Sequence, residues 1–207
     1  MNVFDEIYKN DSWSGGSGPG SDASANQPYM RFVEKFIRKE RISRVVDVGC
    51  GDWQFSRLMN WYDADYEGFD VAESVISNNQ VAFGGGRISF RSYSGDFTEL
   101  PQADLLICKD VLQHLSNSKV CQFVDILPKF KFALITNCVD PKLKAPNNDE
   151  IRDGDFRYLD LRDAPFHVVA SEVLDYGPTA GIRSYIPGFR PVPIWRKKTL
   201  LIQSING

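Results

Sequence analysis

Strand-like and helix-like segments alternate along the first two-thirds of the chain, and this alternation restricts the possible folds more than any other feature. Runs rich in β-branched and aromatic residues, which are typical of strands, occupy residues 44–48, 66–69, 88–93, 103–108 and 130–137. Apolar residues at helical spacing occur in residues 28–40, 74–83 and 118–127, and a further helix is expected to begin near Asp52. This order predicts an α/β fold, in which a parallel sheet carries helices on both faces.

The final third of the chain has a different pattern, because prolines interrupt it repeatedly. Residues 166–173 and 199–205 still resemble strands, and we expect them to close the sheet as an antiparallel pair. The proline-rich residues 177–193 between them are expected to form a long loop near the functional site. His167 falls inside an apolar strand-like run and is therefore interpreted as structural.

The residues before the alternating region form a separate segment. Phe4, Ile7 and Tyr8 have helical spacing, and residues 13–21 that follow are rich in glycine and serine. A flexible leader is one interpretation of such a composition. We favour an ordered arm over a ligand, because Tyr8 and Trp13 would be costly to expose and a glycine backbone allows close approach. Residues 1–28 are therefore expected to be an arm that covers the site, and residues 29–207 the main domain.

Ligands of open α/β sheets bind beyond the carboxyl ends of the strands, and a glycine turn follows the first strand here. Gly49 and Gly51 let the backbone pass close to a ligand, but the third glycine of a dinucleotide site is absent at Gln54. Asp70 ends the next strand, about 20 residues further on, where an acidic side chain can accept hydrogen bonds from both hydroxyls of a ribose. A turn residue or helix cap is the alternative interpretation of Asp70.

Two further strand ends carry polar residues. Asp96 could accept a hydrogen bond from the exocyclic amine of adenine while Phe97 covers the ring, although a turn beside a core phenylalanine would look the same. Asp110 and His114 are one helical turn apart, so a carboxylate and an imidazole could lie together over the strand tips. The alternative here is a capping aspartate beside a half-buried histidine.

The composition narrows the class of protein. The chain has 24 basic and 27 acidic residues and a net charge of −3, which argues against a nucleic-acid partner. Its four cysteines lack CxxC spacing, which makes a zinc site an unfavoured interpretation. No apolar run reaches the ~18 residues of a membrane span, and no signal pattern opens the chain, so we expect a cytoplasmic protein. Its size would also suit one part of a larger multidomain protein.

The run from Val45 to Leu115 resembles the class I S-adenosylmethionine-dependent methyltransferases, in its Asp-x-Gly-Cys-Gly turn and its second-strand and third-strand acids. Three further elements resemble a narrower group, the small sugar O-methyltransferases of polysaccharide and viral glycan synthesis. They are the glycine-rich N-terminal element, Cys-Gly-Asp-Trp and Cys-Lys-Asp-Val-Leu-Gln-His-Leu-Ser. The resemblance extends weakly to residues 154–161 and 165–166. It implies a Rossmann-like, seven-stranded, mostly parallel sheet with an antiparallel C-terminal strand pair.

The same resemblance implies S-adenosylmethionine as cofactor and a sugar or glycan as acceptor. Trp53 stands where the class often has a third glycine, and it is expected to narrow the pocket beside the cofactor. The expected cofactor-binding residues are Asp47, Gly49, Cys50, Gly51, Trp53, Asp70, Val71, Asp96, Phe97, Lys109, Trp13, Ser17 and Gly18.

A sugar hydroxyl is a poor nucleophile, so a base is expected, and His114 is the best candidate, with Asp110 orienting it or sharing its role. Arg157, Asp160 and Asp140 are expected to hold substrate hydroxyls. A divalent metal on Asp110, Asp140 and Asp160 is an unfavoured alternative, because no spacing demands it. N-methylation of a small amine or phospho-amine and a non-catalytic cofactor-binding subunit also remain open. Methylation of a nucleobase amine is less favoured, because the Asn/Asp-Pro-Pro-aromatic clamp is missing.

Overall fold

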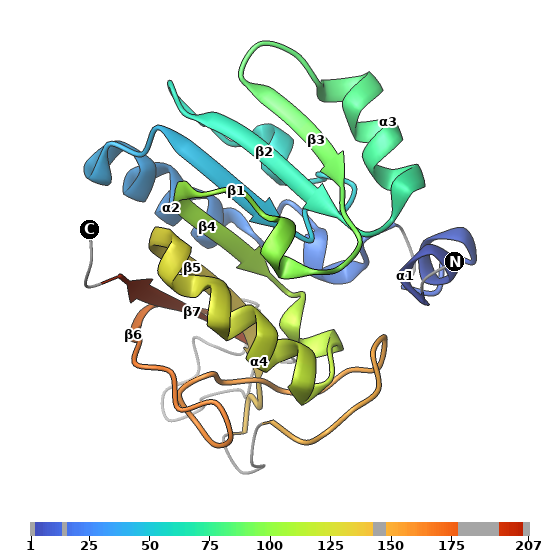
Figure 1. Cartoon of the computed structure of the whole chain (residues 1–207), viewed down its shortest axis with the longest axis vertical. Coiled ribbons are helices and arrows are strands. Elements are labelled where there is room, and N and C mark those ends of the chain that lie inside the picture. Colours follow the sequence, from blue (N-terminus) through green and yellow to red (C-terminus); the bar gives the residue numbers. More distant parts are fainter. Residues whose placement is uncertain (1–2, 14–15, 143–147, 178–194, 205–207) are drawn as a thin grey trace, which may run out of the picture.

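A computed structural model describes residues 3–13, 16–142, 148–177 and 195–204, and its centre is one seven-stranded sheet (Figure 1). The strand order is β3-β2-β1-β4-β5-β7-β6, with β1 to β5 parallel and β7 antiparallel to both β5 and β6. This confirms the predicted fold class, the closing antiparallel pair included. The strands are β1 Arg44–Val48, β2 Asp65–Asp70, β3 Ile88–Ser92, β4 Ala103–Lys109, β5 Phe130–Val139, β6 Ser171–Tyr176 and β7 Arg196–Gln203.

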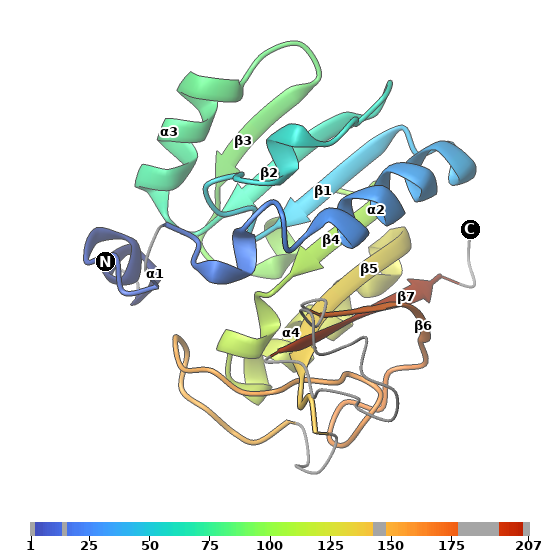
Figure 2. The same cartoon turned by 180° about the vertical axis from the view of Figure 1, so that it is seen from behind.

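Helices cover both faces of the sheet. α2 lies on one face and α4 on the other, while α3 packs along the β3 edge and α1 lies beyond the arrowheads of β1 and β2 (Figures 1 and 2). The helices are α1 Val3–Lys9, α2 Gln27–Glu40, α3 Glu73–Phe83 and α4 Asn117–Ile126. The short 3-10 turns are η1 Pro19–Ser21, η2 Ser56–Leu58, η3 Phe97–Glu99, η4 Leu112–His114 and η5 Leu127–Lys129. None of the helices in the described residues is long and apolar enough to cross a membrane.

Side chains alternate between two cores along the parallel strands. Val45 of β1 packs into the core beneath α2, whereas Val46 and Val48 pack into the core beneath α4. A parallel strand buried on both faces needs such a continuous apolar run. In α2, Pro28 stands in the first turn, and every third or fourth residue is buried, which is the amphipathic pattern that predicts this helix.

Two expected elements differ from the structure. Only the single turn η2 follows Asp52, because Trp53 has a positive φ of 56° and packs its indole between strand and helix aromatics. The strand expected at 166–173 begins at Ser171, because Phe166 and His167 donate backbone hydrogen bonds to Asp163 and close a turn. His167 is therefore an exposed turn residue, not a strand residue. Residues 178–193 of the expected long loop lie outside the described residues.

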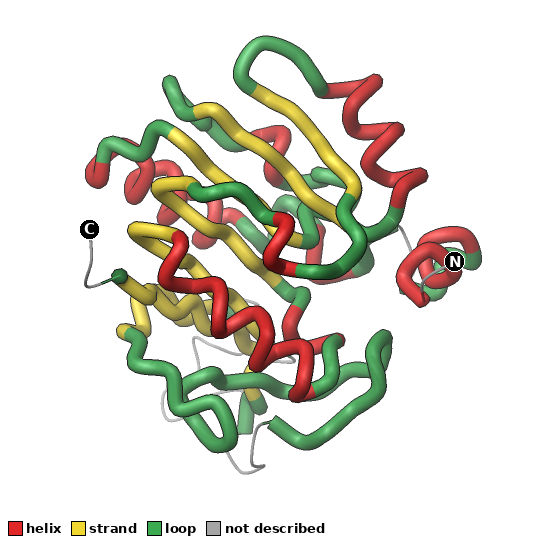
Figure 3. The backbone as a smooth tube through the Cα atoms, viewed as in Figure 1, coloured by secondary structure: helices red, strands yellow, loops and turns green. Residues whose placement is uncertain are grey.

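Residues 148–170 join the parallel part of the sheet to β6 without a helix or strand (Figure 3). Their stability comes instead from specific hydrogen bonds. Buried Asn148, for example, donates its side-chain amide to the carbonyls of Asp160 and Ala164 and accepts from the backbone of Asp160. This long connection is thus tied to itself and packed against the α4 face, where Leu159 and Leu161 are buried.

The antiparallel closure of the sheet depends on a polar pair at its centre. Thr136 of β5 and Thr199 of β7 are both 0% exposed, and their hydroxyls lie 2.8 Å apart. Thr136→Val should lower the free energy of unfolding by about 1–3 kcal/mol, because it leaves the Thr199 hydroxyl buried without its partner. The double variant Thr136→Val/Thr199→Val should recover most of this loss in chemical denaturation. Losses that simply add in the double variant would show that the pair does not interact.

Candidate active site

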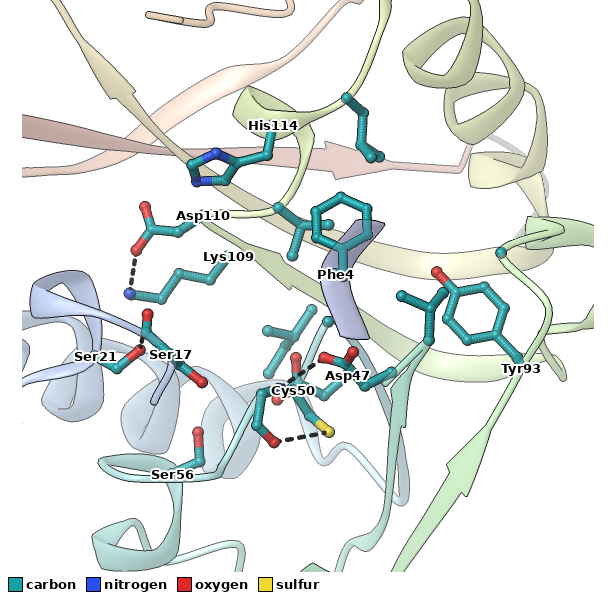
Figure 4. A pocket seen from close by; sticks show the side chains of 18 of the residues that line it. Phe4, Ser17, Ser21, Asp47, Cys50, Ser56, Tyr93, Lys109, Asp110 and His114 are labelled. Atoms are coloured by element: carbon teal, nitrogen blue, oxygen red, sulfur yellow. Dashed lines mark hydrogen bonds and ion pairs between the residues drawn. The ribbon is translucent and has the colours of Figure 1, made fainter. Parts of the chain in front are cut away.

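A cavity opens at the carboxyl ends of β1, β2, β3 and β4, where the strand order reverses, and its space is about 1360 Å³ including its solvent-filled mouth (Figure 4). Ligands of open α/β sheets bind at such a reversal. The glycine turn, the residues after β2 and β3, the β4 tip with η4, and the N-terminal segment all contribute to its wall. Residues expected from the sequence that do line it are Trp13, Ser17, Asp47, Gly49, Cys50, Gly51, Asp70, Val71, Phe97, Lys109, Asp110 and His114.

Three backbone hydrogen bonds hold the glycine turn against the end of β2. Gly49 and Cys50 donate to the carbonyl of Phe69 at 2.7 and 3.1 Å, and Gly51 donates to the Asp70 carboxylate at 3.1 Å. Both glycines have positive φ, 70° and 55°. A Cβ on Gly49 would lie 2.2 Å from Val111, and one on Gly51 would lie 2.2 Å from the Ser17 hydroxyl, so space as well as conformation requires glycine here.

Asp70 is a buried acid with spare acceptor capacity. It is 7% exposed, and its two carboxylate oxygens each accept one backbone hydrogen bond, from Gly51 and from Ala72 at 3.0 Å. Burial raises the pKa of Asp70, although these bonds oppose the shift. Because each oxygen has a second lone pair, Asp70 can still accept two hydrogen bonds from a ligand in the cavity.

Asp47, at the other side of the glycine turn, is also buried. Its carboxylate accepts a hydrogen bond from the Tyr66 hydroxyl at 2.7 Å. Burial raises the pKa of Asp47 to about 7, while the Tyr66 bond and the charge of Lys109 oppose the shift. A cationic ligand group near Asp47 would therefore favour its ionised form.

A buried charge cluster lies at the β4 tip. The Lys109 ammonium is 2.5 Å from the Asp110 carboxylate, and Lys197 of β7 pairs with the same carboxylate oxygen. Both lysines also donate to the carbonyl of Gly20, at 3.1 and 3.2 Å. Burial lowers the pKa of Lys109 to about 8. Burial opposes ionisation of Asp110, but the charges of Lys109 and Lys197 outweigh it and lower the Asp110 pKa.

His114 is fixed by backbone and amide groups. Its Nδ1 lies 2.9 Å from the carbonyl of Asp155, so Nδ1 carries the proton and donates. Its Nε2 is left with a lone pair, 3.3 Å from the amide nitrogen of Gln113, whose oxygen accepts from the Cys138 backbone. Burial lowers the pKa of His114, which keeps the imidazole neutral. The Asp110 carboxylate pairs with the two lysines. The group that orients His114 is therefore the Asp155 carbonyl and not the expected Asp110 carboxylate.

The N-terminal segment is ordered against the glycine turn. The Ser17 hydroxyl accepts from the backbone of Asp52 at 2.9 Å and pairs with the Tyr8 hydroxyl at 2.9 Å. Trp13 packs edge-on against Tyr8 and lies 5.3 Å from the His114 ring, measured between ring centroids. Phe4 and Ser21 of the same segment also line the cavity. The segment therefore forms one wall of the site.

Three residues that we expected to contact the cofactor do not line the cavity. Trp53 packs in the core against Tyr66 and Phe90, so it does not narrow the cavity. Asp96 is exposed and caps η3, where it accepts from the Thr98 backbone at 2.8 Å. Gly18 is buried behind Trp13 and lies outside the lining.

The residues expected at the substrate have structural partners. Buried Arg157 donates to the carbonyls of Asp149 and Leu115, both at 2.6 Å. Asp160 pairs with Arg162 at 2.6 Å, and Asp140 accepts from the Lys142 backbone at 2.9 Å. None of the three lines the cavity. Within the described ranges, no three histidine, cysteine or acidic residues gather into a metal-binding group, so Asp110, Asp140 and Asp160 do not form the alternative metal site.

Sequence reasoning missed several residues of the site. Tyr29 of α2 lies at the cavity with 1% exposure, and only its hydroxyl on an otherwise apolar helix face could have indicated this. Lys197 stands in a run of three basic residues, 196–198, and its partner Asp110 is 87 residues away along the chain, so no local pattern indicates their pairing. The role of the Asp155 carbonyl could not be predicted, because every residue has a backbone carbonyl.

Comparison with known proteins shows the fold. No family model matches the chain, and no curated protein matches it. The solved methyltransferase domain of bacterial CtHen1-C has a TM-score of 0.62 at 16% identity, over 86% of this chain and 98% of that one. The chain has a methyltransferase fold.

Two further methyltransferase-fold structures cover most of the chain. The N-terminal domain of EvdMO1, solved in the presence of SAH and D-fucose, has a TM-score of 0.57 at 12% identity, over 98% of this chain and 97% of that one. Magnesium protoporphyrin IX methyltransferase from Synechocystis PCC 6803, with bound SAH, has a TM-score of 0.55 at 14% identity, over 86% of this chain and 83% of that one. At these identities the likeness concerns the fold, and the chemistry has to be argued from the site itself.

The bonds of Arg157 predict a structural role that can be tested. Arg157→Met should lower the free energy of unfolding by about 1.5–3 kcal/mol, because two carbonyls lose a charged donor. The exposed Arg152→Met is the matched control and should leave stability unchanged in the same denaturation experiment. Unchanged stability of Arg157→Met with weaker acceptor binding would instead support a direct substrate role.

Proposed function

We propose that the protein is an S-adenosylmethionine-dependent O-methyltransferase that methylates a hydroxyl of a sugar in a glycan or polysaccharide. The observation that carries the proposal is the placement of His114, which lines the same cavity as the glycine turn and Asp70 and whose Nδ1 is held by the Asp155 carbonyl. A base and an adenosine-type cradle thus share one cavity on a methyltransferase fold.

The residues present fit the proposed cofactor along the whole cavity. Asp70 would accept hydrogen bonds from the ribose hydroxyls, with Val71 beside it, and Tyr93 to Gly95 with Phe97 would surround the adenine. At the other end, Lys109 would hold the carboxylate of the amino-acid part. The ammonium of that amino-acid part would lie against Asp47 and the Asp110 Oδ1 atom. This Asp110 atom is buried without a hydrogen-bond partner among the described residues. When bound, S-adenosylmethionine supplies an electrophilic methyl group on its sulfonium.

His114 would act as the general base. An acceptor hydroxyl that approaches Nε2 would replace the long contact with Gln113 and pass its proton to that nitrogen. The hydroxyl oxygen would bond to the sulfonium methyl group as the bond between that methyl group and sulfur breaks, and the electron pair of the broken bond would stay on the sulfur, which leaves as a neutral thioether. The Asp155 carbonyl holds the Nδ1 proton and would stabilise the imidazolium that results. The cavity walls supply the alignment of hydroxyl and methyl group, which is the larger part of such catalysis.

The sugar acceptor rests on two lines of support. The motifs around Cys50 and Asp110 resemble the small methyltransferases of glycan synthesis. EvdMO1, whose N-terminal domain shares the fold over nearly the whole chain, was crystallised with D-fucose. In this proposal residues 1–28 cover the cofactor, since Phe4, Tyr8, Trp13 and Ser17 line the cavity opposite the strand tips.

The ribose role of Asp70 predicts a binding defect. Asp70→Ala should weaken binding of S-adenosylmethionine about 10- to 100-fold in calorimetry, because two hydrogen bonds to a charged acceptor are lost. Asp96→Ala is the matched control and should leave the affinity unchanged, because Asp96 lies outside the cavity. The reverse ranking of the two variants would restore the adenine role of Asp96 and remove the ribose role of Asp70.

The base role of His114 predicts a turnover defect and a pH dependence. His114→Ala should lower kcat about 10²- to 10⁴-fold with unchanged cofactor affinity, and the exposed His167→Ala should have no effect. Because the neutral imidazole is the active form and burial lowers the pKa of His114 below 6.5, wild-type activity should fall only below pH 6.5. Activity that holds in His114→Ala, or an acid limb that survives the substitution, would refute the role.

A further inference from the structure

Phe156 is a large apolar side chain left exposed beside the candidate base. It is 52% exposed, although phenylalanine is normally buried. Its ring lies 5.7 Å from the His114 ring and 5.6 Å from the Tyr158 ring, between centroids. Trp13 contacts the same histidine ring. His114 is thus contacted by aromatic side chains from two segments that are far apart in the sequence.

Backbone hydrogen bonds fix Phe156 relative to His114. Gly154 donates to the carbonyl of His114 at 2.8 Å, and Arg157 donates to the carbonyl of Gln113 at 3.1 Å. These two bonds enclose Phe156 in the sequence, and the His114 Nδ1–Asp155 bond lies between them. Phe156 is therefore exposed although its backbone is held in place on both sides.

Polar groups also line the cavity that His114 borders. Lys119 and Asp153 form an ion pair at 2.8 Å, and both line the cavity. The exposed Asp155 lies next to Phe156 in the chain. An apolar face beside hydrogen-bonding groups suits a ligand that has both characters, as a pyranose ring does with its C–H face and its hydroxyls. A purely apolar ligand would desolvate the polar groups without pairing them.

We propose that the exposed ring of Phe156 is the platform on which the sugar ring of the acceptor stacks, so that one of its hydroxyls reaches His114 Nε2. This proposal rests on the proposed function and adds the residue that selects the acceptor. The platform adjoins the cavity through His114, so the sugar lies at the mouth while the cofactor occupies the interior. Arg157 is a positioning residue in this arrangement, because its bonds to Leu115 and Asp149 hold the Phe156 segment.

Substitutions at Phe156 test the platform. Binding of the methyl glycosides of glucose, galactose, mannose and fucose is measured by saturation-transfer NMR on the full chain with S-adenosylhomocysteine present, and KM and kcat are measured for those that are methylated. Phe156→Ala should weaken binding and raise KM about two- to tenfold, with kcat little changed. Phe156→Leu should behave like Phe156→Ala, because it keeps apolar area but loses the flat ring, whereas Phe156→Tyr should retain wild-type values.

A matched control separates stacking from loss of any exposed ring. Tyr62 is 41% exposed and is not among the described residues that line the cavity, so Tyr62→Ala should change neither binding nor KM. Equal affinity of wild type and Phe156→Ala for every glycoside would overturn the platform, as would full retention in Phe156→Leu. Binding of phenols in place of glycosides, with the same dependence on Phe156, would overturn the sugar assignment.

The two proposals can fail separately. If wild type binds a glycoside through Phe156 but transfers no methyl group to it, the proposed function fails and the platform stands. If wild type methylates a glycoside with a KM that Phe156→Ala leaves unchanged, the proposed function stands and the platform fails. If wild type neither binds nor methylates any glycoside of the panel, both the sugar acceptor and the platform are refuted.

Discussion

The hydrogen bonds between the glycine turn and the end of β2 are the constraint on which the rest of the site depends. They place Gly51 against Asp70 and set the height of the turn over the sheet. Val111 then packs where a side chain on Gly49 would stand, and the Ser17 hydroxyl takes the place beside Gly51. One local backbone arrangement therefore fixes the cavity floor, the position of the β4 tip and the docking of the N-terminal segment.

The buried charge cluster is the second link between distant parts of the chain. Two ammonium groups and one carboxylate leave an excess positive charge in a region of low solvent access, which is costly unless other groups solvate it. The Gly20 carbonyl accepts from both Lys109 and Lys197, so the N-terminal segment contributes to that solvation. The Asp110 Oδ1 atom remains without a partner in the described residues, which is consistent with a ligand group that completes the cluster.

Apolar spacing predicts the alternating strands and helices, and the glycines predict the turn after β1, because both signals are local properties of the sequence. Asp70 could be found from its place at a strand end. Trp53, Asp96 and Arg157 could not be placed correctly, because spacing along a chain does not reveal where a side chain points: Trp53 turns into the core and Asp96 caps its own turn. Lys197 depends on a strand pairing far away in sequence, and the group that orients His114 is a backbone carbonyl.

The two halves of the site are built differently, and this has a consequence for specificity. In the proposed function, the cofactor half would come from strand tips, whose positions the parallel sheet fixes. The acceptor half would come from η4 and the irregular residues 148–170, which backbone hydrogen bonds join at Gln113 and His114. Because those bonds involve no side chain of residues 154–157, a substitution at Phe156 would change the surface beside His114 while these backbone bonds remain. In the proposed function, acceptor choice and cofactor binding would therefore be separable, and selection on residues beside His114 would alter one while preserving the other.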